Sequence, residues 1–215
     1  NPPDTAAAPA LIEAARKALG GAIDLILIAH GDLGDQLLSE HDYREAERLL
    51  RINLLSVIAL LVPLADLLEQ QGRGHIAVMS SVAGDRGRPR NYTYGAAKGA
   101  LTLYLQGLRS RLYPAGVAVT TLKLGPVDTP MTVGHPKNPL FTTPERLAPA
   151  IVRAIDRHAR RGGDRIADEL DVRHAGQENA VVLLVVHDVV ADDPELLTRM
   201  FVGFEYTTLA SKRLA

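Results

Sequence analysis

The feature that most constrains this chain is the alternation of short apolar runs with long amphipathic segments. Short runs rich in aliphatic residues occur at Asp24–Ala29, His75–Ser80 and Val117–Leu124. Between them lie His41–Gln70 and Tyr92–Tyr113, in which apolar residues recur at three- and four-residue spacing. A strand buried on both faces has a continuous apolar run, and a helix packed on a sheet has the longer period. The alternation therefore predicts parallel strands joined by right-handed helical crossovers.

Further elements are predicted towards the two ends of the chain. Ala7–Leu19 and Pro144–Arg161 have helical spacing, and the run "AVVLLVV" at Ala180–Val186 predicts a fourth strand. No repeat, low-complexity tract or linker divides the sequence. We therefore expect one α/β domain over residues 1–215, a doubly wound parallel sheet of the Rossmann-like, three-layer α/β/α type.

Composition excludes several classes of function. The 215 residues carry a formal net charge of -1, so the total charge gives no reason to expect nucleic-acid binding. The absence of cysteine excludes disulfides, thiolate metal sites and a cysteine nucleophile. The apolar runs are too short to cross a bilayer, and no basic-then-apolar leader is present. A cytoplasmic protein that does not span a membrane is expected.

The stretch "SSVAGDRGRPRNYTYGAAK" at Ser80–Lys98 follows the second predicted strand, at the sheet edge where such folds bind ligands. Tyr94 and Lys98 are four residues apart, so they share one face of a helix. An ammonium near the ring lowers the pKa of a tyrosine, and the hydroxyl of Ser81 could bind a substrate oxygen. Taken alone, such a pair is weak evidence, because a tyrosine and a lysine four apart are usually a packed ring and a solvated amine.

Two further residues give the pair more weight. Ser81 precedes Tyr94 by thirteen positions, and Asn53 opens "NLLSVIALL" upstream. Together with Lys98 these residues resemble the short-chain dehydrogenase/reductase family, which has an Asn, a Ser and a Tyr-x-x-x-Lys motif in this order. The spacing selects Ser81 and Tyr94 as the matching serine and tyrosine.

The resemblance implies an NAD(P)H-dependent oxidoreductase that acts on a small-molecule carbonyl or secondary alcohol. Tyr94 would then exchange a proton with the substrate oxygen, which Ser81 would hold. Lys98 would lower the pKa of Tyr94 and bind the nicotinamide ribose. Asn53 would hold a water that connects the lysine to solvent, mainly through its backbone in a bent helix.

Two other segments resemble the cofactor-binding parts of that family. "LGPVDTPM" at Leu124–Met131 is similar to its Pro-Gly-x-Val-x-Thr segment, which holds the nicotinamide carboxamide. The matching residues there are Gly125, Val127 and Thr129. In "IAHG", which stands where the family has Asn-Asn-Ala-Gly, only Gly31 matches. We expect His30 to be a hydrogen-bonded residue at the strand end, not a general base.

The glycine-rich turn of the family, roughly Thr-Gly-x-x-x-Gly-x-Gly, is not found in the sequence. We therefore expect a chain that is N-terminally incomplete or rearranged, and the choice between NAD and NADP stays unresolved. Ala180–Val186 and Glu195–Leu214 are interpreted as the family's last strand and terminal helix. The alternative is an unusual chain order, in which this region precedes Asn1 in the family's arrangement.

A narrower resemblance concerns "AHGDLGD" and "AGDRGRPRNYTYG". Both are similar to the branch that contains the reductase partner of decaprenylphosphoryl-ribose 2-epimerase, which implies a keto-sugar substrate with a lipid-linked phosphate. Arg86, Arg88 and Arg90 could then contact a phosphate, although a solvated loop explains them equally well. Thr132–Thr142 is the expected substrate loop.

The family resemblance also implies a homodimer or homotetramer, paired through Arg44–Leu68 and Tyr94–Leu112. A non-catalytic binding or scaffold protein of the same fold, or a fragment unable to bind cofactor, is the alternative function.

Overall fold

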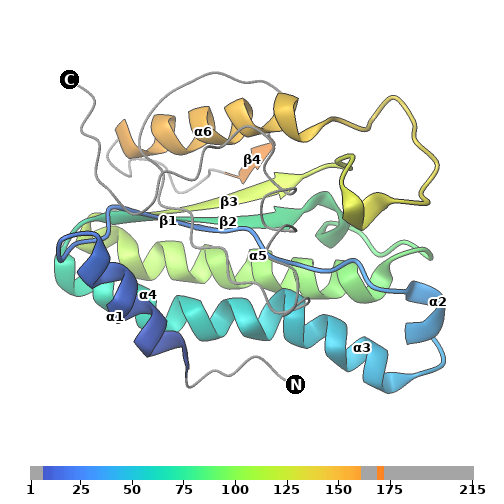
Figure 1. Cartoon of the computed structure of the whole chain (residues 1–215), viewed down its shortest axis with the longest axis horizontal. Coiled ribbons are helices and arrows are strands. Elements are labelled where there is room, and N and C mark those ends of the chain that lie inside the picture. Colours follow the sequence, from blue (N-terminus) through green and yellow to red (C-terminus); the bar gives the residue numbers. More distant parts are fainter. Residues whose placement is uncertain (1–6, 161–168, 172–215) are drawn as a thin grey trace.

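The computed structural model describes residues 7–160 and 169–171, in which parallel strands form one sheet (Figure 1). The sheet order is β1-β2-β3-β4, with bounds β1 Leu25–Ile28, β2 Gly74–Ser81, β3 Val117–Leu124 and β4 Glu169–Asp171. The helices are α1 Ala7–Ala18, α2 Gln36–Ser39, α3 Tyr43–Leu50, α4 Ser56–Gln71, α5 Tyr92–Leu112 and α6 Pro144–Arg160. Short turns are η1 Arg51–Leu55, η2 Val82–Gly84, η3 Tyr113–Ala115 and η4 Pro130–Thr132.

The sheet lies between two helical layers, with α6 on one face and α1, α4 and α5 on the other (Figure 1). The register aligns Ile28 with Val78, and Ser81 with Leu124. The carboxyl ends of β2 and β3 therefore lie side by side at one edge of the sheet. This arrangement confirms the predicted doubly wound α/β fold.

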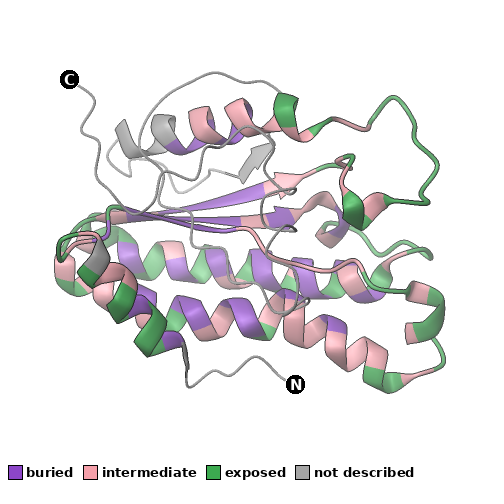
Figure 2. Cartoon of the chain, viewed as in Figure 1, coloured by how far each residue is buried: buried purple, intermediate pink, exposed green. Residues whose placement is uncertain are grey.

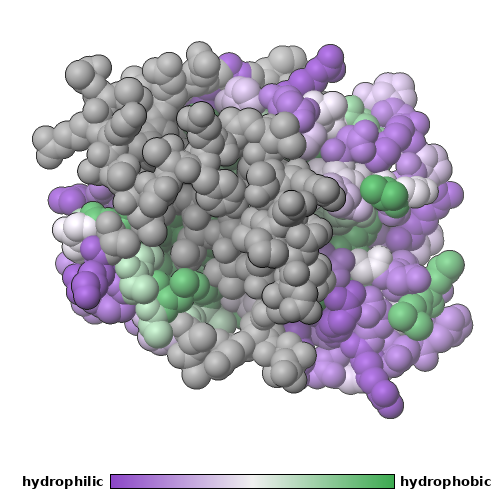
Figure 3. All heavy atoms as spheres, viewed as in Figure 1, coloured by the Kyte–Doolittle hydropathy of each residue, from purple (hydrophilic) through white to green (hydrophobic). Residues whose placement is uncertain are grey.

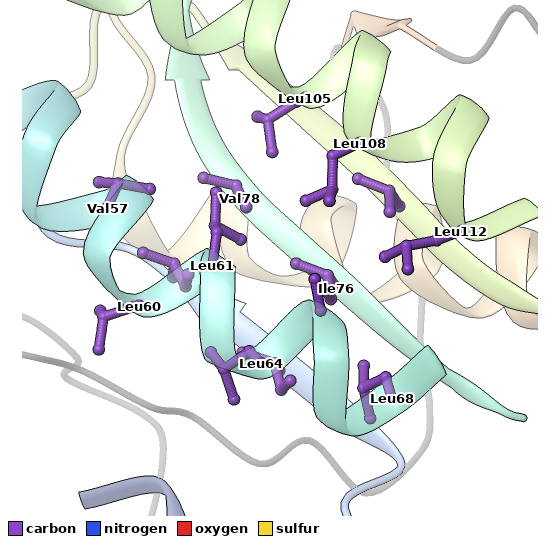
Figure 4. Packing of buried hydrophobic residues seen from close by; sticks show 14 of the residues in the cluster. Val57, Leu60, Leu61, Leu64, Leu68, Ile76, Val78, Leu105, Leu108 and Leu112 are labelled. Atoms are coloured by element: carbon purple, nitrogen blue, oxygen red, sulfur yellow. The ribbon is translucent and has the colours of Figure 1, made fainter. Parts of the chain in front are cut away.

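The larger core fills the space between the sheet and the α4–α5 layer (Figure 4). The residues labelled there are Val57, Leu60, Leu61, Leu64, Leu68, Ile76, Val78, Leu105, Leu108 and Leu112. A smaller cluster joins Leu25, Leu27 and Leu122 to Ile151 and Ile155 of α6 on the other face. Because both faces of the sheet are covered, β1 is buried throughout, and β2 and β3 each contain four consecutive buried residues (Figure 2).

The long helical segment predicted over His41–Gln70 is continuous but not uniform. It consists of α3, a π-helical turn over Arg51–Leu55, and α4. The run Tyr43–Gln71 is long and apolar enough to cross a membrane by length and composition. This finding differs from the expectation that every apolar run is too short. Many of its apolar residues, among them Leu61, Leu64 and Leu68, are buried in the core of the domain, and others, such as Val62, are exposed.

The bounds of the other predicted helices and strands within the described residues agree with the structure to within two residues. The short helix α2 and the edge strand β4 were not predicted. In β4 the sequence "ELD" has only one apolar residue, which gives no periodic signal. The predicted elements Ala180–Val186 and Glu195–Leu214 lie outside the described residues.

Candidate active site

The predicted serine and tyrosine meet at the carboxyl end of β2. Ser81 is the last residue of β2, and Tyr94 lies in the first turn of α5. The Ser81 hydroxyl accepts a hydrogen bond from the backbone N–H of Ala83 at 3.1 Å and donates to the carbonyl of Leu124 at 3.4 Å. It also hydrogen-bonds the Tyr94 side chain. These contacts place the two hydroxyl groups at one point of the sheet edge.

Lys98 lies one turn further along α5 and is 3% exposed. Its ammonium donates to the carbonyl of Met79 at 3.1 Å and lies 5.9 Å from the centroid of the Tyr94 ring. Burial lowers the pKa of Lys98 to about 8, because the charged form loses its hydration. An ammonium has three donors, so two remain for a ligand after the bond to Met79.

The pKa of Tyr94 is raised to about 12. Burial is the largest cause, the interaction with the Ser81 side chain opposes it, and the charge of Asp32 raises the pKa further. The family resemblance led us to expect that Lys98 would lower this pKa. In the protein alone, desolvation of the phenolate dominates, and Lys98 is largely neutral at the pH where Tyr94 ionises because its own pKa is about 8.

Asn53 lies within the π-helical turn and explains it. Its side-chain Nδ2 donates to the carbonyl of Leu49, four residues back, at 3.0 Å. The side chain thus binds a carbonyl that accepts a backbone N–H in a regular α-helix. The turn is wider here, and the N–H of Ser56 donates to the carbonyl of Arg51, five residues back. Nδ2 also donates to the carbonyl of Asp32 at 2.7 Å, and Oδ1 accepts from its N–H at 3.0 Å. The buried amide therefore fixes the segment that follows β1.

Gly31 lies where that segment passes Asn53 and Lys98. A Cβ at Gly31 would lie 2.8 Å from Oδ1 of Asn53 and 3.3 Å from Nζ of Lys98. Only glycine allows this close approach. His30, the preceding residue, has its Nε2 2.7 Å from the hydroxyl of Ser56. The prediction of a hydrogen-bonded histidine at the strand end is confirmed.

The segment after β3 forms a loop that is closed at its base. Val127 pairs with Thr142, the N–H of Asp128 donates to the carbonyl of Thr142 at 2.8 Å, and the N–H of Thr142 donates to the carbonyl of Pro126 at 3.1 Å. The hydroxyl of Thr132 accepts from the N–H of Thr129 at 3.1 Å and donates to the carbonyl of Val127 at 2.8 Å. These bonds fix the backbone of the segment that carries Gly125, Val127 and Thr129.

The surface at this end of the sheet carries many charged groups. Arg86, Arg88 and Arg90 are exposed on the loop between Ser81 and α5. Figure 3 shows a mainly hydrophilic surface here, with small apolar patches. No cluster of three His, Asp or Glu side chains suited to a metal ion occurs within residues 7–160 and 169–171.

Comparison with known proteins identifies the family. Residues 3–139 match the family model described as short chain dehydrogenase.

This chain belongs to the short-chain dehydrogenase family.

Two curated relatives are named as oxidoreductases without further characterisation. One, from Mycobacterium tuberculosis, is 39% identical over 135 residues, which cover 63% of this chain and 54% of the relative. The other, from Streptomyces coelicolor, is 34% identical over 148 residues, which cover 68% of this chain and 56% of the relative. The chain thus spans about half the length of these relatives.

Solved structures of the family share the fold. A levodione reductase is similar with a TM-score of 0.56 and 26% identity, covering 60% of this chain and 50% of that one. A short chain dehydrogenase from Burkholderia cenocepacia, in complex with NADP, has a TM-score of 0.56 and 24% identity, covering 71% and 61%. At that identity the second likeness concerns the fold alone.

The residues present fit the nicotinamide half of the cofactor that the family implies. Lys98 offers two free N–H donors next to the sheet edge. A Cβ at Gly125 would meet nothing within 4 Å, so the backbone there is open to a flat ring. At Gly31, in contrast, the side chains of Asn53 and Lys98 occupy the space that a Cβ would need. Gly31 therefore shapes the site.

Sequence reasoning missed three glycines that hold the site together. A Cβ at Gly84 would lie 2.5 Å from the N of Gly99, and one at Gly95 would lie 2.7 Å from the carbonyl oxygen of Ala83. The turn η2, which follows Ser81, therefore lies directly on the backbone of α5. The signal was available, since Gly95 and Gly99 are four residues apart and flank Lys98 on one helix.

Proposed function

We propose that this chain carries the catalytic part of an NAD(P)H-dependent oxidoreductase, which interconverts a carbonyl and a secondary alcohol. The observation that carries the proposal is the assembly of Ser81, Tyr94 and the buried Lys98 at the carboxyl end of β2. These groups supply an oxygen-binding hydroxyl, a proton donor and a cation.

Each residue has one role in carbonyl reduction. Ser81 holds the substrate oxygen, and Tyr94 donates its proton to that oxygen as negative charge develops there. With its pKa raised to about 12 in the protein alone, Tyr94 is protonated at neutral pH, and positive charge beside the ring would make it a better proton donor. Lys98 binds the ribose and supplies positive charge beside the ring, and the bound nicotinamide supplies the hydride. Asn53 holds the Asp32 backbone through its side chain, and its own backbone in the π-helical turn would hold the water that connects Lys98 to solvent.

The cofactor-binding residues we propose are Gly125, Val127 and Thr129, together with Tyr94 and Lys98, while Gly31 would contribute by letting Asn53 and Lys98 approach its backbone. Val127 and Thr129 offer backbone and hydroxyl groups in a segment fixed by Thr132. NADP and NAD remain alternative cofactors, because no residue that binds the adenosine half is identified.

For the substrate we propose a keto-sugar that bears an anionic group. The three guanidinium groups of Arg86, Arg88 and Arg90 are exposed within five residues of chain between Ser81 and Tyr94. Guanidinium groups bind phosphate and carboxylate well. The triple change to Gln should raise KM for an anionic substrate and leave KM for a neutral ketone unchanged.

For assembly we propose a homodimer or homotetramer that pairs through α4 and α5. Val62 of α4 and Leu103 of α5 are 48% and 69% exposed, so these helices carry apolar side chains away from the core. Leu103→Glu should then lower the mass in solution, as measured by light scattering.

The test of the proposed function begins with calorimetric titration of the chain with NADPH and then NADH. The chain has no tryptophan, so intrinsic fluorescence would report poorly. Hydride transfer to a panel of ketones and keto-sugars is then compared in wild type, Tyr94→Phe and Tyr92→Phe. Tyr92 is 44% exposed and serves as the matched control. We expect activity to be lost only in Tyr94→Phe. Equal activity in the two variants would contradict the proposal, and failure to bind either nucleotide would favour a non-catalytic binding protein of the same fold.

A further inference from the structure

An ion-pair network begins beside the candidate site and runs outward along α3. Nη1 of Arg48 lies 2.6 Å from Oδ2 of Asp32, and the other two guanidinium nitrogens lie 2.7 and 2.8 Å from the carboxylate oxygens of Glu45. One guanidinium therefore bridges two carboxylates. Asp32 is the first residue after Gly31, which contacts Lys98 and Asn53 directly.

Asp32 is fixed in position by more than its ion pair. Its backbone N–H and carbonyl both bind the side chain of Asn53, and its Oδ1 accepts from the N–H of Gly34 at 2.9 Å. The carboxylate side chain is 23% exposed, and that of Glu45 is 11% exposed. A charge held this firmly and only partly solvated acts on its neighbours more strongly than a free surface carboxylate does.

We propose that the Asp32–Arg48 ion pair is a positioning element of the site, which sets how readily Tyr94 gives up its proton. The Asp32 carboxylate opposes ionisation of the ring, and the Arg48 guanidinium offsets that effect. This inference rests on the proposed function of Tyr94 as the proton donor. The charge of Asp32 contributes to the raised pKa of Tyr94 in the protein alone.

Charged groups on the other elements that pack against α5 are largely compensated. Those on the elements packed against α5, and on the adjoining loop, are Arg44, Glu45, Glu47, Arg48, Arg51, Asp66, Glu69, His75, Asp85 and Lys123. Glu47 pairs with Arg51, Asp85 with Lys123, and both Asp66 and Glu69 with Arg111. Arg44, Arg86, Arg88 and Arg90 are exposed and solvated. The network of Asp32, Arg48 and Glu45 is left with one net negative charge, next to Gly31.

Asp32 and Arg48 should affect the ionisation of Tyr94 in opposite directions. Asp32→Asn removes a negative charge and keeps an acceptor for the N–H of Gly34, so Tyr94 should ionise more readily. Arg48→Gln leaves Asp32 and Glu45 uncompensated, so Tyr94 should ionise less readily. If the ion pair were only structural, breaking it from either side would have the same consequence.

The experiment measures the ionised fraction of Tyr94 at one fixed alkaline pH, from the ring-carbon NMR signal of protein labelled at tyrosine. Tyr94→Phe assigns the signal, and circular dichroism verifies the fold at that pH. The ratio of ionised to neutral ring should rise about threefold in Asp32→Asn and fall about threefold in Arg48→Gln, as expected for a shift of about half a pH unit.

Two controls keep the test falsifiable. Arg51→Gln removes the same charge from the same helical segment, where Arg51 pairs with Glu47 at 2.8 Å, and should leave Tyr94 unchanged. Arg48→Lys keeps the charge and should behave as wild type, so the Gln–Lys comparison decides the matter even if Asp32→Asn does not fold. Shifts in the same direction, or no shift, overturn the proposal. Because the measurement needs no nucleotide or substrate, it can fail while the proposed enzymatic function stands, and the reverse also holds.

Discussion

Gly84 and Gly99 face each other so closely that neither position has room for a side chain. A Cβ on Gly84 would lie 2.5 Å from the N of Gly99, and a Cβ on Gly99 would lie 2.8 Å from the carbonyl oxygen of Gly84. The contact joins the turn after Ser81 to α5 one residue beyond Lys98. It therefore fixes the distance between the strand that carries the serine and the helix that carries the tyrosine and lysine.

The first prediction concerns this contact. Gly99→Ala gains about 1 kcal/mol of helix propensity but forces the turn away from α5, and such overpacking costs about 1–3 kcal/mol. We expect a net loss of unfolding free energy in urea, together with a loss of hydride-transfer activity. Gly107→Ala is the matched control on the same helix, because a Cβ there meets nothing within 4 Å. That variant should be more stable than wild type by about 0.5–1 kcal/mol.

The second prediction separates the two adjacent serines at the end of β2. The buried hydroxyl of Ser80 lies 2.7 Å from that of Thr102 and donates to the carbonyl of Lys98 at 3.2 Å. Ser80→Ala should therefore lower the unfolding free energy by about 1 kcal/mol and retain most activity. Ser81→Ala also loses two hydrogen bonds, so it should cost a similar amount of stability, but it should in addition reduce kcat at least tenfold, as loss of a substrate-oxygen donor does. The reverse pattern would show that the family spacing selected the wrong serine.

The third prediction compares two glycines with opposite surroundings. Gly31→Ala places a methyl group against Asn53 and Lys98, so it should destabilise the protein even without ligand. Gly125→Ala has open space and should unfold at the same urea concentration as wild type. If the segment after β3 holds the nicotinamide, Gly125→Ala should nevertheless weaken nucleotide binding in calorimetry. Unchanged affinity would exclude close approach of the ring at this position.

Sequence reasoning reached the residues whose place depends on local pattern. Ser81, Tyr94 and Lys98 could be placed because a strand end and a helix face follow from hydrophobic period alone. The clamp of Asn53 on Asp32 could not, because it joins positions 21 residues apart through one side chain. The same limit hid the contact between Gly84 and Gly99. The direction of the Tyr94 pKa shift was also missed, since burial is a tertiary property and is the largest cause of the shift in the protein alone.

The last prediction follows from the buried lysine. The folded pKa of Lys98 is about 8, against an ordinary value of 10.5, so between these values the unfolded chain binds a proton that the folded chain does not. The unfolding free energy contributed by this group must therefore rise with pH across that window, by about 3 kcal/mol in total. Tyr94 acts in the opposite sense only above its ordinary value of 10.0, because its folded pKa is about 12.

Urea titrations at several pH values from 7.5 to about 10 isolate the lysine, since Tyr94 is protonated in both states over most of that range. Wild type and Tyr94→Phe should both gain stability as the pH rises. Lys98→Met removes the buried charge, so its unfolding free energy should be higher at pH 7.5 and nearly independent of pH. A pH-dependent rise that persists in Lys98→Met would mean that another group titrates, and that the ammonium is better solvated than its position beside the Met79 carbonyl indicates.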